Sequence, residues 1–311
     1  MSDPAIPTVF ESPTGAKLAL YRMAAQGEPR GAVHINHGLA EHAARYGPFA
    51  DFLASRGYHV YAQDHRGHGQ TTAPDAPARQ FGGWNKVMED VAAVNAAIRE
   101  ANPGLPVIIF GHSLGGIVAL NHLMRAPETV DGAAIWNSNA SLGPLTLAMK
   151  GLLGVEGLVG GKGQPSGLMN ALTFAEWNKR FKPNRTDFDW LSRNHEAVDA
   201  YVADPLCGWP ASIALWRDFV AGIEYVQSTA PLKKIPDGLP IQLVGGGQDP
   251  ATDNGKAIEK LSLRMKDAGL ENVQTAIFPD SRHETLNDLD REEAFSLFAD
   301  WADRATAARQ A

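Results

Sequence analysis

The chain has 311 residues, of which 44% are hydrophobic and 20% charged, and these values are typical of a globular protein with one large domain, or one domain with an insertion. The net charge of −7 argues against a nucleic-acid partner and against electrostatic binding to anionic lipid. A single cysteine, Cys207, excludes an intramolecular disulfide, and the N-terminal stretch lacks the pattern of a signal peptide, so we expect a cytoplasmic protein.

The first part of the chain alternates between strand and helix patterns. Apolar or alternating runs predict two strands within 8–23 around a Pro-Thr-Gly turn, and further strands at 31–38, 58–64, 106–113 and 132–138. Apolar residues spaced three and four apart predict helices at 45–57, 84–104 and 117–124. This alternation indicates an α/β fold, in which helices cover both faces of a mostly parallel sheet.

The alternation breaks after residue 140. Residues 142–163 are apolar and rich in glycine, residues 173–210 are rich in Trp, Phe and Pro, and neither stretch contains a convincing strand. We therefore expect a helical cap at 141–216, inserted into a core domain formed by 1–140 and 217–311. The core pattern then resumes with strands at 240–249 and 273–284 and helices at 255–269 and 291–307.

The stretch "FGHSLGG" places Ser113 between a predicted strand and a predicted helix. It fits G-x-S-x-G, the pattern of a nucleophile elbow, in which a tight turn exposes the serine hydroxyl and leaves space only for glycine nearby. The following helix N-terminus offers free N–H groups to an anion. We interpret Ser113 as a nucleophile, the alternative being a glycine-rich packing turn that contains an incidental serine.

A serine nucleophile needs a histidine base and a carboxylate that orients the base, and in this fold they follow in the order Ser, acid, His. Of the ten histidines, only His283 follows a late strand in the required order. Asp249 ends the preceding strand and is the preferred acid. Three nearby aspartates are less suitable, because they lie further from the strand end, before the strand, or too close to the histidine in sequence: Asp253, Asp237 and Asp280.

The tetrahedral intermediate of acyl transfer also needs two N–H donors. One is the backbone of Leu114, directly after the serine. The loop "NHGLAEH" follows an early strand, and its Gly38 allows a close approach, which makes Leu39 N–H the expected second donor.

Two histidine-containing stretches suggest other chemistry. His37 and His42 could form a metal site, but the sequence places no spaced carboxylate or cysteine beside them, so we expect neither a metal nor a cofactor. The stretch "DHRGHGQT" at 64–71 could hold a phosphate, but its glycine spacing is not G-x-G-x-x-G. We expect a structural loop whose polar groups bond within the protein.

Several segments together resemble the α/β-hydrolase superfamily and, more narrowly, the monoacylglycerol lipase and lysophospholipase-like serine hydrolases. They are "HGLAEHAARYGPFADFLASRGY", "DHRGHGQT", "GHSLGG", the Asp249-Pro250 pair and "RHETLND". The resemblance implies the same triad of Ser113, Asp249 and His283, the same two oxyanion donors, and a helical cap inserted late in the sheet.

We therefore expect a serine carboxylic-ester hydrolase that acts on an amphipathic small-molecule acyl ester. The apolar segment Leu142–Gly160 is interpreted as a mobile lid, with Leu152 and Leu153 against the acyl chain and with transient contact to a membrane surface. The alternative for this segment is a poorly ordered loop with no role in substrate binding.

Two other classes of function stay open. An aminopeptidase of the same fold would need an acidic anchor for the substrate's amino terminus, for which Glu176 and Glu196 are candidates. A non-enzymatic ligand-binding relative could keep the triad. A dehalogenase is disfavoured because it needs a carboxylate where Ser113 stands.

Overall fold

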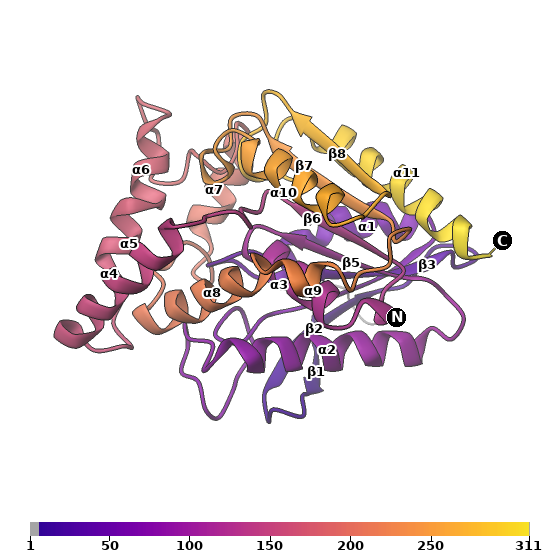
Figure 1. Ribbon diagram of the computed structural model, residues 1–311, viewed down its shortest axis with the longest axis horizontal. Helices are drawn as coiled ribbons and strands as arrows, with labels where there is room; N and C mark the ends of the chain where they lie inside the picture. Colours follow the sequence, from indigo (N-terminus) through magenta and orange to yellow (C-terminus); the bar gives the residue numbers. More distant parts are fainter. Residues whose placement is uncertain (1–5, 311) are drawn as a thin grey trace.

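The computed structural model describes residues 6–310, in which eight strands form one sheet (Figure 1). The strands are β1 (Thr8–Glu11), β2 (Lys17–Met23), β3 (Gly31–Asn36), β4 (Tyr58–Gln63), β5 (Val107–His112), β6 (Gly132–Trp136), β7 (Ile241–Gly246) and β8 (Val273–Phe278). Their order is β1-β2-β4-β3-β5-β6-β7-β8; β2 pairs antiparallel with β1 and with β4, and all other pairs are parallel. The predicted mostly parallel sheet is confirmed.

Helices cover both faces of this sheet. The helices of the described residues are α1 (Gly47–Ser55), α2 (Trp84–Ala101), α3 (Leu114–Arg125), α4 (Leu145–Gly160), α5 (Gly167–Leu172), α6 (Phe174–Lys179), α7 (His195–Ala203), α8 (Ile213–Val226), α9 (Thr229–Leu232), α10 (Lys256–Asp267) and α11 (Arg291–Gln310). Of these, α4, α5 and α6 lie to one side of the sheet (Figure 1). One apolar layer contains buried residues of α2, α3, α8 and α10, and the other contains those of α1 and α11. The three short 3-10 helices are Ala43–Tyr46, Pro127–Thr129 and Pro250–Thr252.

The parallel strands carry the candidate residues to one edge of the sheet. Every residue of β3, β5, β6 and β7 is buried, as expected for strands covered on both faces. In register, Asn36 at the end of β3 pairs with Gly111, and His112 at the end of β5 pairs with Trp136. The loops after β3, β5, β7 and β8 therefore emerge side by side.

The segment 141–216, expected to be the cap, contains α4 to α7 and the start of α8, which continues to Val226. Its glycine-rich part forms the regular helix α4 in spite of the weak helical tendency of glycine. Met149 and Leu153 are buried on the side of α4 that packs against α8, and this tertiary packing offsets the low propensity.

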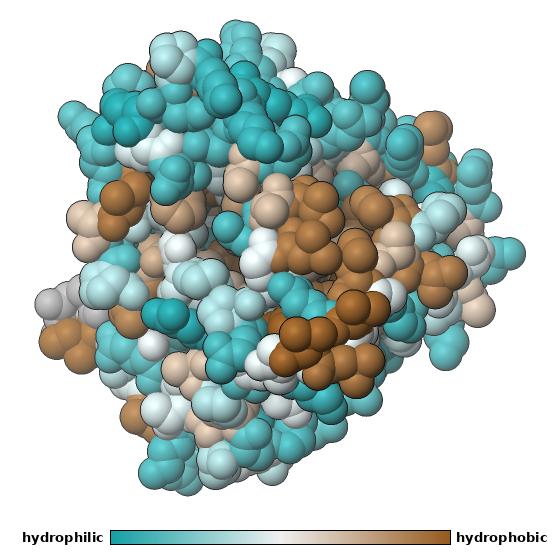
Figure 2. Space-filling view, turned by 90° about the vertical axis from the view of Figure 1, so that its left-hand side faces the viewer, coloured by the Kyte–Doolittle hydropathy of each residue, from teal (hydrophilic) through white to brown (hydrophobic). Residues whose placement is uncertain are grey.

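Outside this packed contact, α4 together with α5 exposes many large apolar side chains (Figure 2). The exposed residues are Leu145, Leu147, Leu152, Val155, Leu158, Val159, Leu168 and Leu172, which we call the α4–α5 patch. Within residues 6–310, no helix is long and apolar enough to cross a membrane.

Candidate active site

Ser113 lies at the sharp turn between β5 and α3. Its backbone has φ 55° and ψ −117°, a strained conformation for a residue with a side chain. Three glycines allow the turn: a Cβ at Gly111 would clash with the Gly115 backbone, one at Gly115 with Asn36, and one at Gly116 with Ser138. The close approach that the motif predicts is therefore present at all three positions.

The structure brings Ser113, His283 and Asp249 together from three different loops. The distance from His283 Nε2 to Ser113 Oγ is 2.9 Å, and His283 Nδ1 lies 3.0 Å from both carboxylate oxygens of Asp249. These are hydrogen-bonding distances in the sequence hydroxyl, imidazole, carboxylate. The arrangement allows the imidazole to take a proton from the hydroxyl while the carboxylate fixes its orientation.

The Asp249 carboxylate is fully buried and surrounded by donors. Besides His283, it accepts hydrogen bonds from Ala251 N (2.9 Å), Thr252 Oγ1 (2.9 Å) and Asn137 Nδ2 (3.3 Å). Burial alone would raise the pKa of Asp249, but His283 and these donors outweigh it and hold the pKa below its ordinary value. The group is therefore a carboxylate at neutral pH.

The three competing aspartates lie away from this contact. Asp253 has a left-handed backbone (φ 52°), its side chain is 55% exposed, and it pairs with Lys256 at 3.5 Å. Asp237 and Asp280 are exposed. Only Asp249 among the four contacts the imidazole of His283.

The two expected oxyanion donors lie next to the serine. Leu114 is the first residue of α3, Leu39 lies in the loop after β3, and both line the cavity that contains Ser113. No residue that the structure describes accepts a hydrogen bond from either N–H. Ala40 follows with φ 56°, and Gly38 N donates to Glu41 Oε1 at 2.6 Å, which fixes the shape of this loop.

A buried charged network, which the sequence reasoning missed, connects the Leu39 loop with the His283 loop. Arg45 pairs with Glu41 and makes a two-pronged contact with Glu284 at 2.7 and 2.8 Å. His112 Nε2 lies 2.9 Å from the carbonyl oxygen of His283, and its Nδ1 lies 3.5 Å from Glu41 Oε1. The i,i+4 spacing of Glu41 and Arg45 was the one signal in the sequence that could have indicated part of it.

The electrostatics of this network favour charged side chains. Burial alone would raise the pKa of Glu41, but Arg45 and His112 lower it well below its ordinary value. Burial alone would lower the pKa of His112, but Glu41 outweighs it and raises the pKa. Arg45 thus contacts both Glu41 and Glu284, and the network connects the two loops through paired rather than isolated charged groups.

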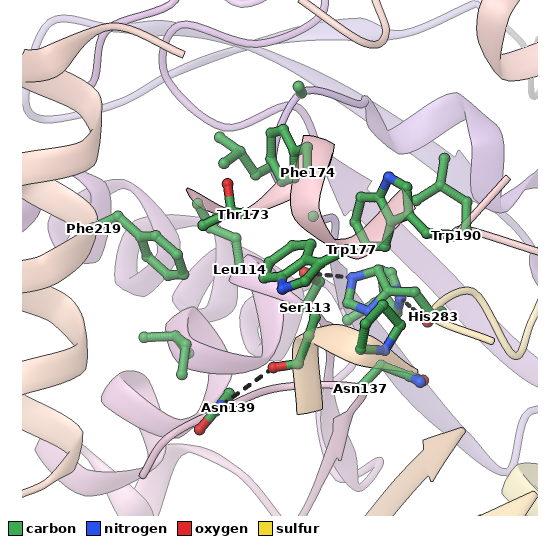
Figure 3. A pocket seen from close by; sticks show the side chains of 18 of the residues that line it. Ser113, Leu114, Asn137, Asn139, Thr173, Phe174, Trp177, Trp190, Phe219 and His283 are labelled. Carbon is green, nitrogen blue, oxygen red and sulfur yellow. Dashed lines mark hydrogen bonds between the residues drawn. The ribbon is translucent and has the colours of Figure 1, made fainter. Parts of the chain in front are cut away.

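Ser113 opens into a mostly apolar cavity of about 270 Å³. Figure 3 shows aromatic side chains from the segment between β6 and β7 around Ser113 and His283. The aromatic lining residues are Phe174, Trp177, Phe188, Trp190, Tyr201, Trp216 and Phe219. The Trp190 ring centroid lies 4.8 Å from that of His283, so this apolar wall reaches the imidazole.

The expectation that Leu152 and Leu153 contact the acyl chain is wrong. Leu153 is fully buried between helices, Leu152 lies on the α4–α5 patch, and neither lines the cavity. The start of α4 presents Leu145 and Met149 to the cavity instead, so Leu145 lies both on the α4–α5 patch and at the cavity wall. The sequence showed the apolar character of α4 but not which side of the helix faces the site.

Most polar groups of the loop 64–71 bond within the protein, which supports its structural interpretation, whereas His65 Nε2 and His68 Nε2 have no hydrogen-bond partner among the described residues. Arg66 is fully buried and donates through Nε to the carbonyl oxygen of Phe81 at 2.8 Å. Asp64 accepts hydrogen bonds from Ala43 N and Gln70 N, both at 2.8 Å. These polar groups are already engaged, so they are not available to cradle a phosphate.

The pair His37 and His42 does not converge on a common point. His37 Nδ1 lies 2.8 Å from Gly38 O, and its Nε2 accepts a hydrogen bond from His65 N at 2.9 Å. His42 instead contacts Asp204, with 2.8 Å between Nε2 and Oδ2. His37 and His42 therefore do not share a metal site in this structure.

Comparison with known proteins agrees with this geometry. A family model described as serine aminopeptidase, S33, matches residues 27–290. The monoacylglycerol lipase of Mycolicibacterium smegmatis is 28% identical over 286 residues, covering 88% of this chain and 88% of that protein. The monoglyceride lipase of Mus musculus is 26% identical over 252 residues, covering 80% of this chain and 76% of that protein.

A solved structure shares the whole architecture. The crystal structure of a thermostable carboxyl esterase from Bacillus coagulans, in complex with glycerol, has a TM-score of 0.86 and 26% sequence identity. The match covers 96% of this chain and 98% of that one.

Proposed function

We propose that this chain, which belongs to the serine aminopeptidase S33 family of α/β-hydrolases, is a serine carboxylic-ester hydrolase that cleaves monoacylglycerol or lysophospholipid-like esters. The observation that carries the proposal is the line of contacts from Ser113 through His283 to Asp249 at the floor of an apolar cavity. The esterase and lipase relatives support ester hydrolysis as the reaction.

In the proposed mechanism, Ser113 Oγ attacks the acyl carbonyl while His283 Nε2 takes the hydroxyl proton. Asp249 holds the imidazole and stabilises its protonated form. The N–H groups of Leu39 and Leu114 stabilise the negative charge that develops on the carbonyl oxygen. His283 then gives its proton to the leaving alcohol, and a water molecule activated by the same imidazole releases the acid from the acyl-enzyme.

The cavity favours an acyl chain over a sugar or a peptide. Its walls are mainly aromatic and aliphatic, with a few polar groups such as Asn139. A monoacyl amphiphile combines one apolar chain with a small polar head, and this cavity offers both environments. The carboxylates of Glu41 and Glu284 at the cavity wall already pair with Arg45.

The proposed cap, 141–216, supplies the apolar wall and the surface by which we expect the protein to reach its substrate. The α4–α5 patch is too apolar to be explained by the solvated face of a helix. Gly143 (φ 54°) and Gly161 (φ 83°) flank α4 with left-handed backbones that permit hinge movement. We infer that α4 acts as a lid and that the patch makes transient contact with a lipid surface.

The family description also raises an aminopeptidase as an alternative. Its acidic anchor is not found at the expected positions, because Glu176 and Glu196 are exposed and neither lines the cavity. Glu176 pairs with Lys179 at 2.8 Å on the surface of α6. An ester substrate, which needs no such anchor, fits better.

The test is a substrate panel at one enzyme concentration. It contains p-nitrophenyl esters from acetate to decanoate, a monoacylglycerol, a lysophospholipid and an aminoacyl-arylamide. We expect rapid turnover of the monoacyl lipids and medium-chain esters and negligible turnover of the arylamide. A preference for the arylamide would reassign the chain to the peptidases, and turnover of no substrate above background would favour a ligand-binding relative.

A further inference from the structure

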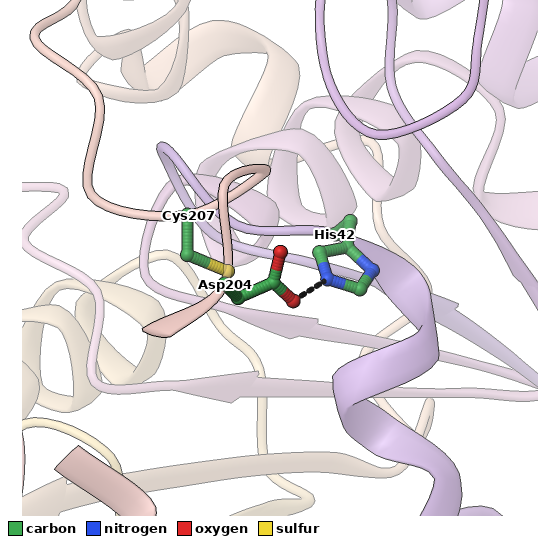
Figure 4. Close-up of side chains that lie close together, drawn as sticks. All are labelled: His42, Asp204 and Cys207. Carbon is green, nitrogen blue, oxygen red and sulfur yellow. Dashed lines mark hydrogen bonds and ion pairs between the residues drawn. The ribbon is translucent and has the colours of Figure 1, made fainter. Parts of the chain in front are cut away.

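Three metal-binding types of side chain meet where the cap segment contacts the Leu39 loop. His42 from the core and Asp204 and Cys207 from the segment after α7 offer one nitrogen, one oxygen and one sulfur atom, all within 4.8 Å of one another (Figure 4). The sequence places Asp204 and Cys207 more than 160 residues after His42. The structure thus brings to His42 the carboxylate and the cysteine whose absence argued against a metal site.

A turn holds the two cap ligands on the same side. Cys207 N donates to the carbonyl oxygen of Asp204 at 3.0 Å, and Leu206 N donates to Asp204 Oδ1 at 2.8 Å. The second oxygen, Oδ2, faces His42 Nε2 at 2.8 Å. Ligand pairs separated by two intervening residues are common in zinc sites. The D-x-x-C spacing likewise directs two donor atoms toward one point.

The donor set matches a thiophilic divalent cation. Zn²⁺ binds Cys, His and Asp at about 2.0–2.3 Å, so its tetrahedral ligands lie about 3.5 Å apart. The ligand atoms here lie within 4.8 Å of one another, so the widest pair has to close by up to about 1.3 Å. Asp204 is 29% and His42 10% exposed, which leaves a path from solvent for the ion and a water ligand.

The three side chains also suit the charge of the ion. Zn²⁺ binds cysteine as the thiolate and histidine as the neutral imidazole, so binding at this site would release protons. One thiolate and one carboxylate then balance the charge of a divalent cation.

We propose that His42, Asp204 and Cys207 bind one Zn²⁺ ion that clamps the cap segment to the loop carrying Leu39. The same segment already contacts this loop, because Gly208 N and Tyr201 Oη both donate to the carbonyl oxygen of Ala40 at 2.9 Å. Ala40 is the left-handed residue directly after Leu39. The ion adds a third attachment there, and the proposal does not depend on the ester chemistry.

Co²⁺ titration of the chelator-treated full chain tests the proposal. Because Cys207 is the only cysteine, a thiolate-to-cobalt charge-transfer band in the near ultraviolet reports this site alone. We expect the band to saturate at one equivalent and to disappear on addition of Zn²⁺. Cys207→Ser abolishes the band, and Zn²⁺ affinity falls by more than about 100-fold, since even outer-shell changes cost 10- to 100-fold.

Two further variants keep the test decisive if Cys207→Ser folds poorly. His42→Gln should reduce Zn²⁺ affinity by at least about tenfold, whereas His195→Gln, which removes an exposed histidine of α7, should leave it unchanged. The midpoint of thermal unfolding should rise by about 5 °C in Zn²⁺ at a hundredfold excess over Kd in the parent chain. Co²⁺ binding without a thiolate band, or unchanged Zn²⁺ affinity in His42→Gln, would overturn the proposal.

Discussion

The turn around Ser113 and the helix α4 line the same cavity, but glycine serves opposite purposes in them. At Gly115 a side chain would clash with the backbone of Asn36, whereas at Gly154 it would meet nothing within 4 Å. The first region is buried and fixed by close contacts, and the second is held on one side and exposes apolar residues on the other. We therefore predict that the chemistry depends on the first region and the choice of substrate on the second.

The largest expected effect is on the rigid side. Ser113→Ala should lower kcat for a medium-chain ester by more than about 10⁴-fold, because removal of a nucleophile leaves only binding and oxyanion stabilisation. The midpoint of thermal unfolding should stay close to that of the parent, since among residues 6–310 the hydroxyl forms a hydrogen bond only with His283. Activity within tenfold of the parent, in a folded variant, would mean that another residue is the nucleophile.

A matched pair of glycine substitutions tests the difference in packing between the Ser113 turn and α4. Gly115→Ala should destabilise the protein by more than about 3 kcal/mol, because the new methyl group overlaps backbone atoms that cannot move. Gly154→Ala should stabilise it by up to about 1 kcal/mol through higher helix propensity. Urea unfolding curves measure both changes, and equal destabilisation by the two variants would show that α4 is packed as tightly as the turn.

Substrate selectivity should change when the cavity side of α4 is altered. Met149→Ser removes an apolar side chain from the cavity wall, so kcat/KM for a decanoate ester should fall about tenfold more than for acetate. Leu158→Ser is the control, because Leu158 is 87% exposed on the same helix and lies outside the cavity.

The control separates the two sides of α4. Leu158→Ser should leave the turnover of dissolved short-chain esters unchanged and should lower the rate on lipid vesicles. If Met149→Ser reduces both esters equally, α4 does not bind the acyl chain.

The smallest effect concerns acid stability, which depends on buried neutral histidines of the core. Burial lowers the pKa of His122 and His37 to about 4 and that of His34 and His68 to about 3. The unfolded chain therefore binds more protons than the folded chain below about pH 6.5. The contribution of these histidines to the free energy of unfolding is complete above about pH 6.5 and is lost as pH falls toward their pKa values in the folded protein.

One histidine can be removed to test this sign. His122→Gln should reduce the slope of unfolding free energy against pH by about 1 kcal/mol per pH unit between about pH 5 and 6. His195→Gln in the cap segment should not change the slope, because His195 is exposed. A steeper slope in His122→Gln would contradict the buried neutral state.

The fold and the proximity of the three site residues could be predicted because both follow from local patterns. Val107–His112, Ser113 and α3 are contiguous in sequence, and Asp249 and His283 each follow a strand whose end lies at the same edge of the sheet. The catalytic roles of these residues and of the Leu39 and Leu114 amides stay predictions.

Contacts between distant segments could not be predicted in this way. The pairing of Arg45 with Glu284 and the meeting of His42 with Asp204 and Cys207 depend on how the loops fold over the sheet. The choice between Met149 and Leu152 depends on the rotation of α4 about its own axis, and a helix that is apolar on both sides gives no periodicity to fix it.

Covalent labelling tests the central claim most directly. The parent chain is incubated with a fluorophosphonate ester, which reacts with activated serines, and the adduct is located by peptide mass spectrometry. We predict a single adduct on Ser113, with labelling strongly slowed in His283→Gln and absent in Ser113→Ala. Stoichiometric labelling of a different residue, or no labelling of a folded and ester-hydrolysing chain, would contradict the proposed mechanism.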